Sequence, residues 1–189
     1  MKTKFFYIIA FILLVSSTTI FAQGFTAPVE GKAVVYFVRV SGFGGAISFE
    51  YFHQNKYIGI FKGKNYMRYE CDPGKNLFWA SSENKEFITA DLIEGRSYIV
   101  IVDIIMGAWK ARVGLRPITV NDSEVFERAK ELIMKKSPII TTSDKIEKMN
   151  EKLRPFIAEK LKMYNEVWKN EKGFKHISSE MAIPANAMK

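Results

Sequence analysis

The chain has 189 residues, of which 48% are hydrophobic and 14% aromatic, so it has the material for a sizeable core. Its single cysteine excludes an intramolecular disulfide, and stability must therefore come from that core. The formal net charge is +8, but basic and acidic residues are interspersed, which argues against a nucleic-acid partner and favours an ordinary solvated surface.

Residues 1–22 have the pattern of a secretory signal peptide: two early lysines, an apolar stretch at 5–15, and small residues ending at Ala22. We predict cleavage between Ala22 and Gln23 and export to the periplasm or the exterior. An uncleaved anchor at 5–22 is the alternative, but that stretch is barely long enough to span a bilayer and hydroxyl residues interrupt it. Gln23 stands where a bacterial lipoprotein carries its lipidated cysteine, so we predict no lipid anchor. We also expect no transmembrane segment after cleavage.

Between residues 23 and 120 the apolar residues form short runs or alternate with polar ones, and turn residues separate the runs. This pattern predicts one domain, an antiparallel β-sandwich of immunoglobulin-like or transthyretin-like type with about eight strands. The continuous apolar run "AVVYFV" is typical of a central strand. The strands are predicted at residues 32–39, 46–53, 56–61, 66–71, 76–81, 86–92, 96–104 and 109–118.

Cys71 ends the predicted strand 66–71, beside an Asp-Pro-Gly turn. A nucleophilic thiol needs a histidine or a helix N-terminus beside it, and the two histidines, His53 and His176, lie at a strand end and in the C-terminal segment. We therefore predict that Cys71 packs in the core and is not catalytic. One face of its strand takes Met67, Tyr69 and Cys71, and the other takes Tyr66, Arg68 and Glu70.

After Val120 the apolar period becomes that of a helix, and residues 121–172 are predicted to form a helical extension of two or three amphipathic helices. Asn121 and Glu124 have the spacing of a capping box at the start of the first helix. Residues 173–189 show no period and are predicted to be a tail. The apolar face of the first helix is predicted to consist of Val125, Phe126, Ala129, Leu132 and Ile133.

A second helix is predicted to begin near Ser143, and Pro155 predicts a kink or a break into two abutting helices. Its apolar face must be covered, and we expect it to dock on the sandwich; a helix of a partner protein is the alternative. This face is predicted to consist of Ile146, Met149, Leu153, Ile157, Leu161, Tyr164 and Trp168.

Several motifs within residues 32–118 carry a family resemblance: the opening "VVYFVR", the Pro-Gly hairpin with its aromatic strand "NLFWAS", and the closing "MGAWKARVGLRP". On these motifs the domain resembles a bacterial exported β-sandwich family of unknown function, and it is similar to PEGA-type accessory domains. The resemblance implies a fold and a cell-envelope location, but no activity and no catalytic residues. The missing lipidated cysteine is a departure from the lipoprotein members of that family.

The last predicted strand carries the candidate binding residues. Trp109 alternates with a basic row formed by Lys110, Arg112 and Arg116, which suits contact with an anionic envelope polymer or an acidic protein face; a solvated strand face is the simpler interpretation. Trp79 and Trp109 are candidates for a sugar-stacking platform, although core packing is more common for such residues.

The remaining patterns favour no chemistry. The glycine-rich stretch "SGFGG" precedes a strand rather than a helix, so we interpret it as a turn and not as a phosphate loop. We predict no catalytic constellation, no metal site and no cofactor, because the histidines, the cysteine and the carboxylates lack ligand spacing. We therefore expect a non-enzymatic envelope protein that binds or supports an unknown partner. The alternatives are a carbohydrate- or polymer-binding module and an enzyme of unrecognised type.

Overall fold

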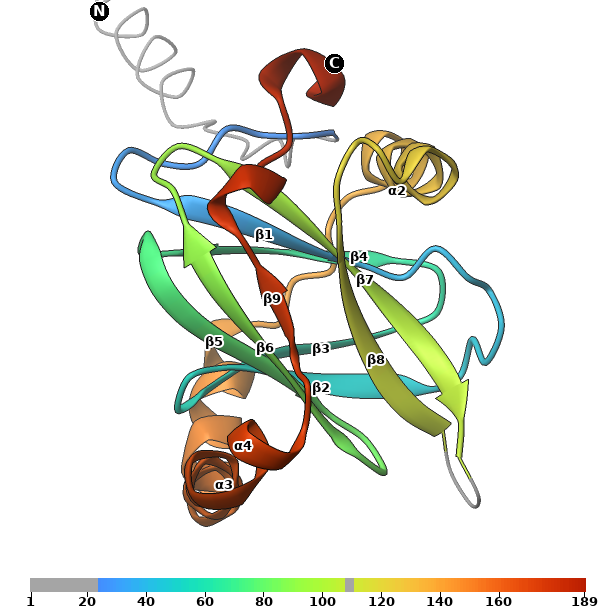
Figure 1. Ribbon diagram of the computed structural model, residues 1–189. Helices are drawn as coiled ribbons and strands as arrows, with labels where there is room; N and C mark the ends of the chain where they lie inside the picture. Colours follow the sequence, from blue (N-terminus) through green and yellow to red (C-terminus); the bar gives the residue numbers. More distant parts are fainter. Residues whose placement is uncertain (1–23, 108–110) are drawn as a thin grey trace, which may run out of the picture.

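Figure 1 shows the computed structural model, which describes residues 24–107 and 111–189. The predicted signal peptide and its cleavage site before Gln23 lie outside the described residues. Among the helices that the structure describes, none is long and apolar enough to cross a membrane.

In the described residues, nine strands form two sheets that face each other (Figure 1). Sheet A has four strands in the order β4 (Tyr66–Cys71), β1 (Ala33–Val38), β7 (Ser97–Met106) and β8 (Ala111–Ile118). Sheet B has five strands in the order β3 (Lys56–Lys62), β2 (Ser48–His53), β5 (Gly74–Ser81), β6 (Lys85–Leu92) and β9 (Lys175–Ile177).

The predicted fold class, mainly β with C-terminal helices, is confirmed, and each of the eight predicted strands is present. Two pairings differ from the antiparallel expectation, because β1 pairs with β7 and β6 with β9 in parallel. After β1 the chain enters sheet B, and it comes back to sheet A only with β4 and later with β7, which are the two neighbours of β1. One of them, β7, runs in the same direction as β1.

Strand alternation sorts the side chains between the two faces of each sheet. In β1, Val35 and Phe37 point into the core between the sheets, whereas Tyr36 and Val38 point outward. Both faces of β1 are buried, because a helix covers the outer face of sheet A. This burial on both sides explains the continuous apolar run in the sequence.

Helix α2 (Ser123–Lys135) covers the outer face of sheet A. Its predicted apolar face is confirmed: Phe126, Ala129, Leu132 and Ile133 are buried against the sheet, and Val125 is partly buried. The predicted capping box is wrong. The N-cap is Asp122, and its carboxylate accepts a hydrogen bond from the Thr119 backbone N–H (2.8 Å) instead of closing onto the helix.

Helix α3 (Ser143–Met163) covers the outer face of sheet B on the opposite side of the molecule (Figure 1). It continues through a π-helical turn (Tyr164–Trp168) into the short α4 (Lys169–Glu171). The expected break at Pro155 does not occur. Pro155 has no N–H, so the carbonyl of Glu151 lacks its helical donor. Both residues are exposed, so water can solvate that carbonyl, and the helix stays continuous.

Residues 173–189 are more than the tail that the sequence predicts. Within them, β9 adds a parallel strand to the edge of sheet B, and Ile177 is buried in the core between the sheets. Ile183 then packs beside α2 on the outer face of sheet A, where its N–H donates to the Ser97 carbonyl (2.8 Å). This short segment therefore contacts both sheets.

Candidate binding groove at the open edge of the sandwich

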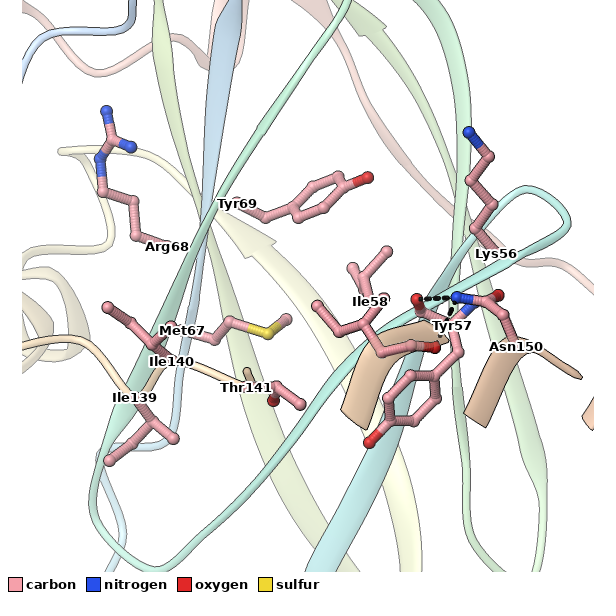
Figure 2. A pocket seen from close by; sticks show the side chains of 11 residues that line it. Lys56, Tyr57, Ile58, Met67, Arg68, Tyr69, Ile139, Ile140, Thr141 and Asn150 are labelled. Carbon is pink, nitrogen blue, oxygen red and sulfur yellow. Dashed lines mark hydrogen bonds between the residues drawn. The ribbon is translucent and has the colours of Figure 1, made fainter. Parts of the chain in front are cut away.

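The side of the sandwich between β3 and β4 carries a groove of about 300 Å³ (Figure 2). These strands follow one another in the chain but are the edges of different sheets, so no main-chain ladder closes the sandwich between them. The linker from α2 to α3 closes one end, and α3 forms part of the outer wall. The lining is mainly apolar, with Ile58, Met67, Tyr69, Ile139, Ile140 and Ile146 as its main side chains.

The backbone of β4 borders the groove. The Ile139 N–H donates to the Tyr66 carbonyl (2.8 Å), so the main-chain groups of Tyr66 point away from β1 and toward the groove. Along a strand of an antiparallel pair, the N–H and C=O groups of successive residues point alternately toward and away from the partner strand. The main-chain groups of Arg68 and Glu70 therefore point away from β1, like those of Tyr66. The Arg68 side chain points away from the groove (Figure 2), where its guanidinium donates to the Glu70 carboxylate (2.9 Å).

The backbone of β3, on the other wall, is already covered. Asn150 of α3 accepts a hydrogen bond from the Tyr57 N–H (2.8 Å) and donates to the Tyr57 carbonyl (3.1 Å), as a paired strand would. The Thr141 hydroxyl accepts a hydrogen bond from the Ile60 N–H (3.3 Å). A bulge in β3 leaves Ile58 without a partner in β2 and lets it point into the groove (Figure 2).

A glycine in β3 allows β3, β4 and the α2–α3 linker to approach one another closely. A Cβ at Gly59 would lie 2.9 Å from both the Met67 sulfur and the Thr141 hydroxyl, so β3, β4 and the linker approach one another over its bare backbone. Beyond this contact, Ile140 of the linker remains 56% exposed at the mouth of the groove. Single exposed isoleucines are common on protein surfaces, and it is the position of Ile140 beside an apolar groove that makes it a candidate contact residue.

Polar groups converge beyond Tyr69, where a hydrogen-bonded chain links the strands β2, β4 and β5. Asn76 donates to the carbonyls of Asp72 and Gly74, so its side-chain oxygen accepts a hydrogen bond from His53 Nε2 (2.7 Å). His53 Nδ1 then accepts a hydrogen bond from the Tyr69 hydroxyl (3.1 Å). Burial raises the pKa of Tyr69 to about 12, which keeps this donor protonated.

The His53 ring gives the fold a pH dependence. Burial lowers its pKa, and Lys56 acts in the same direction, against the Asn76 hydrogen bond and Asp72. As the pH falls below the unfolded-state pKa of about 6.5, the unfolded chain takes up a proton that the native ring resists, so stability is lost. We expect His53→Gln to show a smaller fall in the free energy of unfolding between roughly pH 7 and pH 5, measured by denaturant titration. Equal slopes in the two proteins would contradict this assignment.

Cys71 packs in the core between the sheets, as predicted. Burial, aided by Asp72, raises the pKa of its thiol to about 12, so the reactive thiolate is scarce at neutral pH. We expect Cys71→Ala to lower the free energy of unfolding by about 1 kcal/mol and the native thiol to react slowly with a thiol reagent. Labelling of the native protein as fast as that of the unfolded chain would contradict the buried position.

The predicted basic row is not part of the groove. Trp109 and Lys110 lie outside the described residues. Arg112 is exposed on the outer face of sheet A, opposite Ile105 of β7, and Arg116 pairs with Asp103 (3.2 Å). An ion pair neutralises one member of the row, so the described part of β8 is a weaker polyanion site than the sequence suggests.

Trp79 packs in the core, as the sequence favours, and the alternative of a sugar-stacking role is excluded for this residue. Its ring is fully buried beneath α3, stacked on Phe52 with 3.8 Å between the ring centroids. A buried ring offers no face to a sugar, so Trp79 is a core residue. Among the described residues, no group of three or more His, Cys, Asp or Glu side chains is arranged to hold a metal ion.

Sequence reasoning missed the groove, although one signal was present. The stretch "SPIITTS" reads as a linker, yet it contains two adjacent isoleucines, which a purely solvated linker does not need. Ile139 and Ile140 are those residues. The partners that they meet come from β3 and β4, and only the fold brings these elements together.

The chain was compared with family models, with curated proteins and with solved structures, and nothing matches it in any of the three. The resemblance to an exported β-sandwich family therefore remains a prediction, and the functional argument rests on the geometry of the fold.

Proposed function

We propose that this protein is an exported, non-enzymatic binding module of the cell envelope, and that the groove between β3 and β4 binds an extended segment of a partner protein. The signal-peptide pattern of residues 1–22 supports export. The observation that carries the binding site is the open main-chain edge of β4 at Arg68, which lies beside an apolar groove.

The groove suits a peptide strand. An extended segment added to β4 would accept a hydrogen bond from the Arg68 N–H and donate one to the Arg68 carbonyl. Alternate side chains of the segment would then enter the groove between Ile58 and Met67. The bond between Ile139 and Tyr66 already has the form of the first rung of such a ladder. On the β3 side, Asn150 and Thr141 occupy the equivalent main-chain groups, so pairing is directed to β4.

The chemistry of the lining favours a peptide over a charged polymer. Lys56 and Arg68 are the charged residues that line the groove, and the Arg68 guanidinium points away from it. A volume of about 300 Å³ lies at the lower end of the range for ligand pockets and fits one or two apolar side chains. The specificity of such a site comes from those side chains, and its affinity comes largely from the main chain.

A photo-cross-linking amino acid at position 140 tests the site in the intact envelope. We expect an adduct with one partner chain, mapped to a single extended segment of that partner. The matched control carries the same amino acid at Ile93, a similarly exposed isoleucine in the β6–β7 loop, and should give no such adduct. Equal adducts at both positions, or none at position 140, would refute the proposed site.

Hydrogen exchange then tests the mode of binding. A synthetic peptide with the sequence of the cross-linked segment should slow exchange at the amides of Arg68 and Glu70. The same peptide with alternate backbone nitrogens methylated should not, because it lacks the N–H groups that a ladder needs. Binding that leaves both amides unprotected would show that the partner does not add a strand.

Export is tested separately by the mass of the protein recovered from the envelope. We expect a mature chain that begins at Gln23. A product that retains Met1 would favour the uncleaved anchor.

A further inference from the structure

One end of the sandwich holds the β1–β2 loop and the end of β7, and three apolar side chains there are exposed. Phe43, in the loop between β1 and β2, is 60% exposed. Ile105 and Met106, at the end of β7, are 49% and 71% exposed. We call Phe43, Ile105 and Met106 the apolar tip. None of these three residues lines the groove between β3 and β4, so the apolar tip is a separate surface.

The β1–β2 loop, which carries Phe43, is in contact with the end of β7, which carries Ile105 and Met106. Gly44 has φ +61°, and a Cβ there would lie 2.8 Å from the Cδ1 atom of Ile104, so the β1–β2 loop rests directly on β7 just before the exposed pair. The β3–β4 turn lies on the other side of the loop, since a Cβ at Gly63 would lie 3.5 Å from the Gly45 carbonyl oxygen. The β1–β2 loop therefore lies beside both the end of β7 and the β3–β4 turn.

A buried arginine holds Phe43 in its exposed position. The Arg39 guanidinium is buried and donates hydrogen bonds to the carbonyls of Phe43 (2.7 Å), Gly44 (2.6 Å) and Ile47 (2.7 Å). These charge-assisted bonds fix the loop backbone on which Phe43 is carried. The exposure of Phe43 is therefore a property of an ordered loop.

The charges around the apolar tip are mainly positive. Lys62 and Lys64 are exposed in and beside the β3–β4 turn, and Arg112 lies opposite Ile105 across the β7–β8 pair. Asp103, two residues before Ile105 on the same face of β7, is a carboxylate near the apolar tip, and it is paired with Arg116 (3.2 Å). Glu83, in the turn between β5 and β6, is a carboxylate at this end.

We propose that the apolar tip docks on an anionic lipid bilayer, with Phe43, Ile105 and Met106 entering the interface and Lys62, Lys64 and Arg112 facing the phosphate groups. Exposed apolar side chains ringed by cations are what an anionic membrane surface binds, because apolar burial and electrostatic attraction then act together. The molecule would sit end-on to the membrane and leave the groove accessible at its side.

Sedimentation with lipid vesicles tests the proposal. The chain from Gln23 to Lys189 contains every described element and lacks the apolar N-terminal stretch, which would bind lipid by itself. We expect it to bind vesicles of phosphatidylcholine with phosphatidylglycerol and to bind pure phosphatidylcholine far more weakly. High salt should weaken binding, because it screens the attraction of Lys62, Lys64 and Arg112 to the lipid phosphates.

Two variants separate the apolar and the electrostatic contributions. The double variant Phe43→Ser/Met106→Ser should lower the partition coefficient at least about tenfold, because two large apolar side chains no longer enter the interface. Lys62→Gln/Lys64→Gln should remove most of the preference for the anionic vesicles. Val29→Ser, at an exposed apolar residue in another part of the molecule, is the control and should bind like the wild type.

Thermal melting of each variant confirms that it is folded before it is compared. Failure of the wild-type chain to bind anionic vesicles would overturn the proposal. So would equal binding by the wild type and the folded Phe43→Ser/Met106→Ser variant. The cross-linking experiment at Ile140 is independent of either result, so the membrane surface and the peptide groove are tested separately.

Discussion

Replacing Trp79 with alanine is expected to lower the free energy of unfolding by about 3–5 kcal/mol, the usual cost of emptying a fully buried aromatic site. The Trp79 ring stacks on Phe52 and Phe87 between sheet B and α3. Its indole N–H donates to the Gln54 carbonyl (3.0 Å) in the β2–β3 turn, where Gln54 has φ +49°. The substitution therefore leaves a cavity beneath the helix and also removes a hydrogen bond from a strained turn.

Denaturant unfolding measures this loss, and Trp168→Ala is the matched control. Trp168 belongs to the same cluster, but it lies at its partly exposed rim near the Lys172 ammonium. Its removal leaves little cavity, so we expect a clearly smaller loss of stability. Equal effects at the two positions would mean that α3 does not seal the cluster around Trp79.

Ending the chain after Val120 is expected to leave a sandwich that aggregates or fails to fold. The truncation removes α2, α3 and β9 together and so uncovers both outer faces. Each large side chain left in water costs roughly 1.5–3 kcal/mol relative to its buried state. The newly exposed aromatic residues are Tyr36, Phe52, Tyr57, Tyr66, Trp79 and Phe87.

Light scattering and thermal melting of the chain from Gln23 to Val120 would check this expectation. A second truncation, after Gly173, keeps both helices and removes Phe174, β9 and the residues beyond it. We expect that chain to be soluble but less stable than the full fold. A monomeric Gln23–Val120 domain with unchanged melting would show that the helices are accessory to the fold.

The sequence is informative about elements whose pattern is local. β1 could be predicted as a central strand because both of its faces are buried and its residues are apolar throughout. The apolar face of α3 could be predicted from helical spacing alone, and the structure confirms the expected docking on the sandwich. In both cases the residues that become buried form a pattern within a single strand or helix.

Features that depend on several elements could not be predicted in the same way. β9 has three residues, too few for alternation to be visible, and it is a strand only because the edge of β6 is free to pair with it. The groove needs the bulge at Ile58, the bare backbone of Gly59 and the crossing of the linker at Tyr66. The contacts of the linker join residues far apart in the sequence, and no local pattern reveals them.

The position of β9 has a consequence for the order in which the protein can fold. A chain emerges from the ribosome N-terminus first, so Lys175–Ile177 and Ile183 appear after all the other strands and helices. Until then the outer edge of β6 is unpaired and the Ser97 carbonyl lacks the donor that Ile183 supplies. β9 thus completes sheet B and Ile183 adds a hydrogen bond at sheet A, so a nascent chain stays incompletely folded until this late segment has left the ribosome.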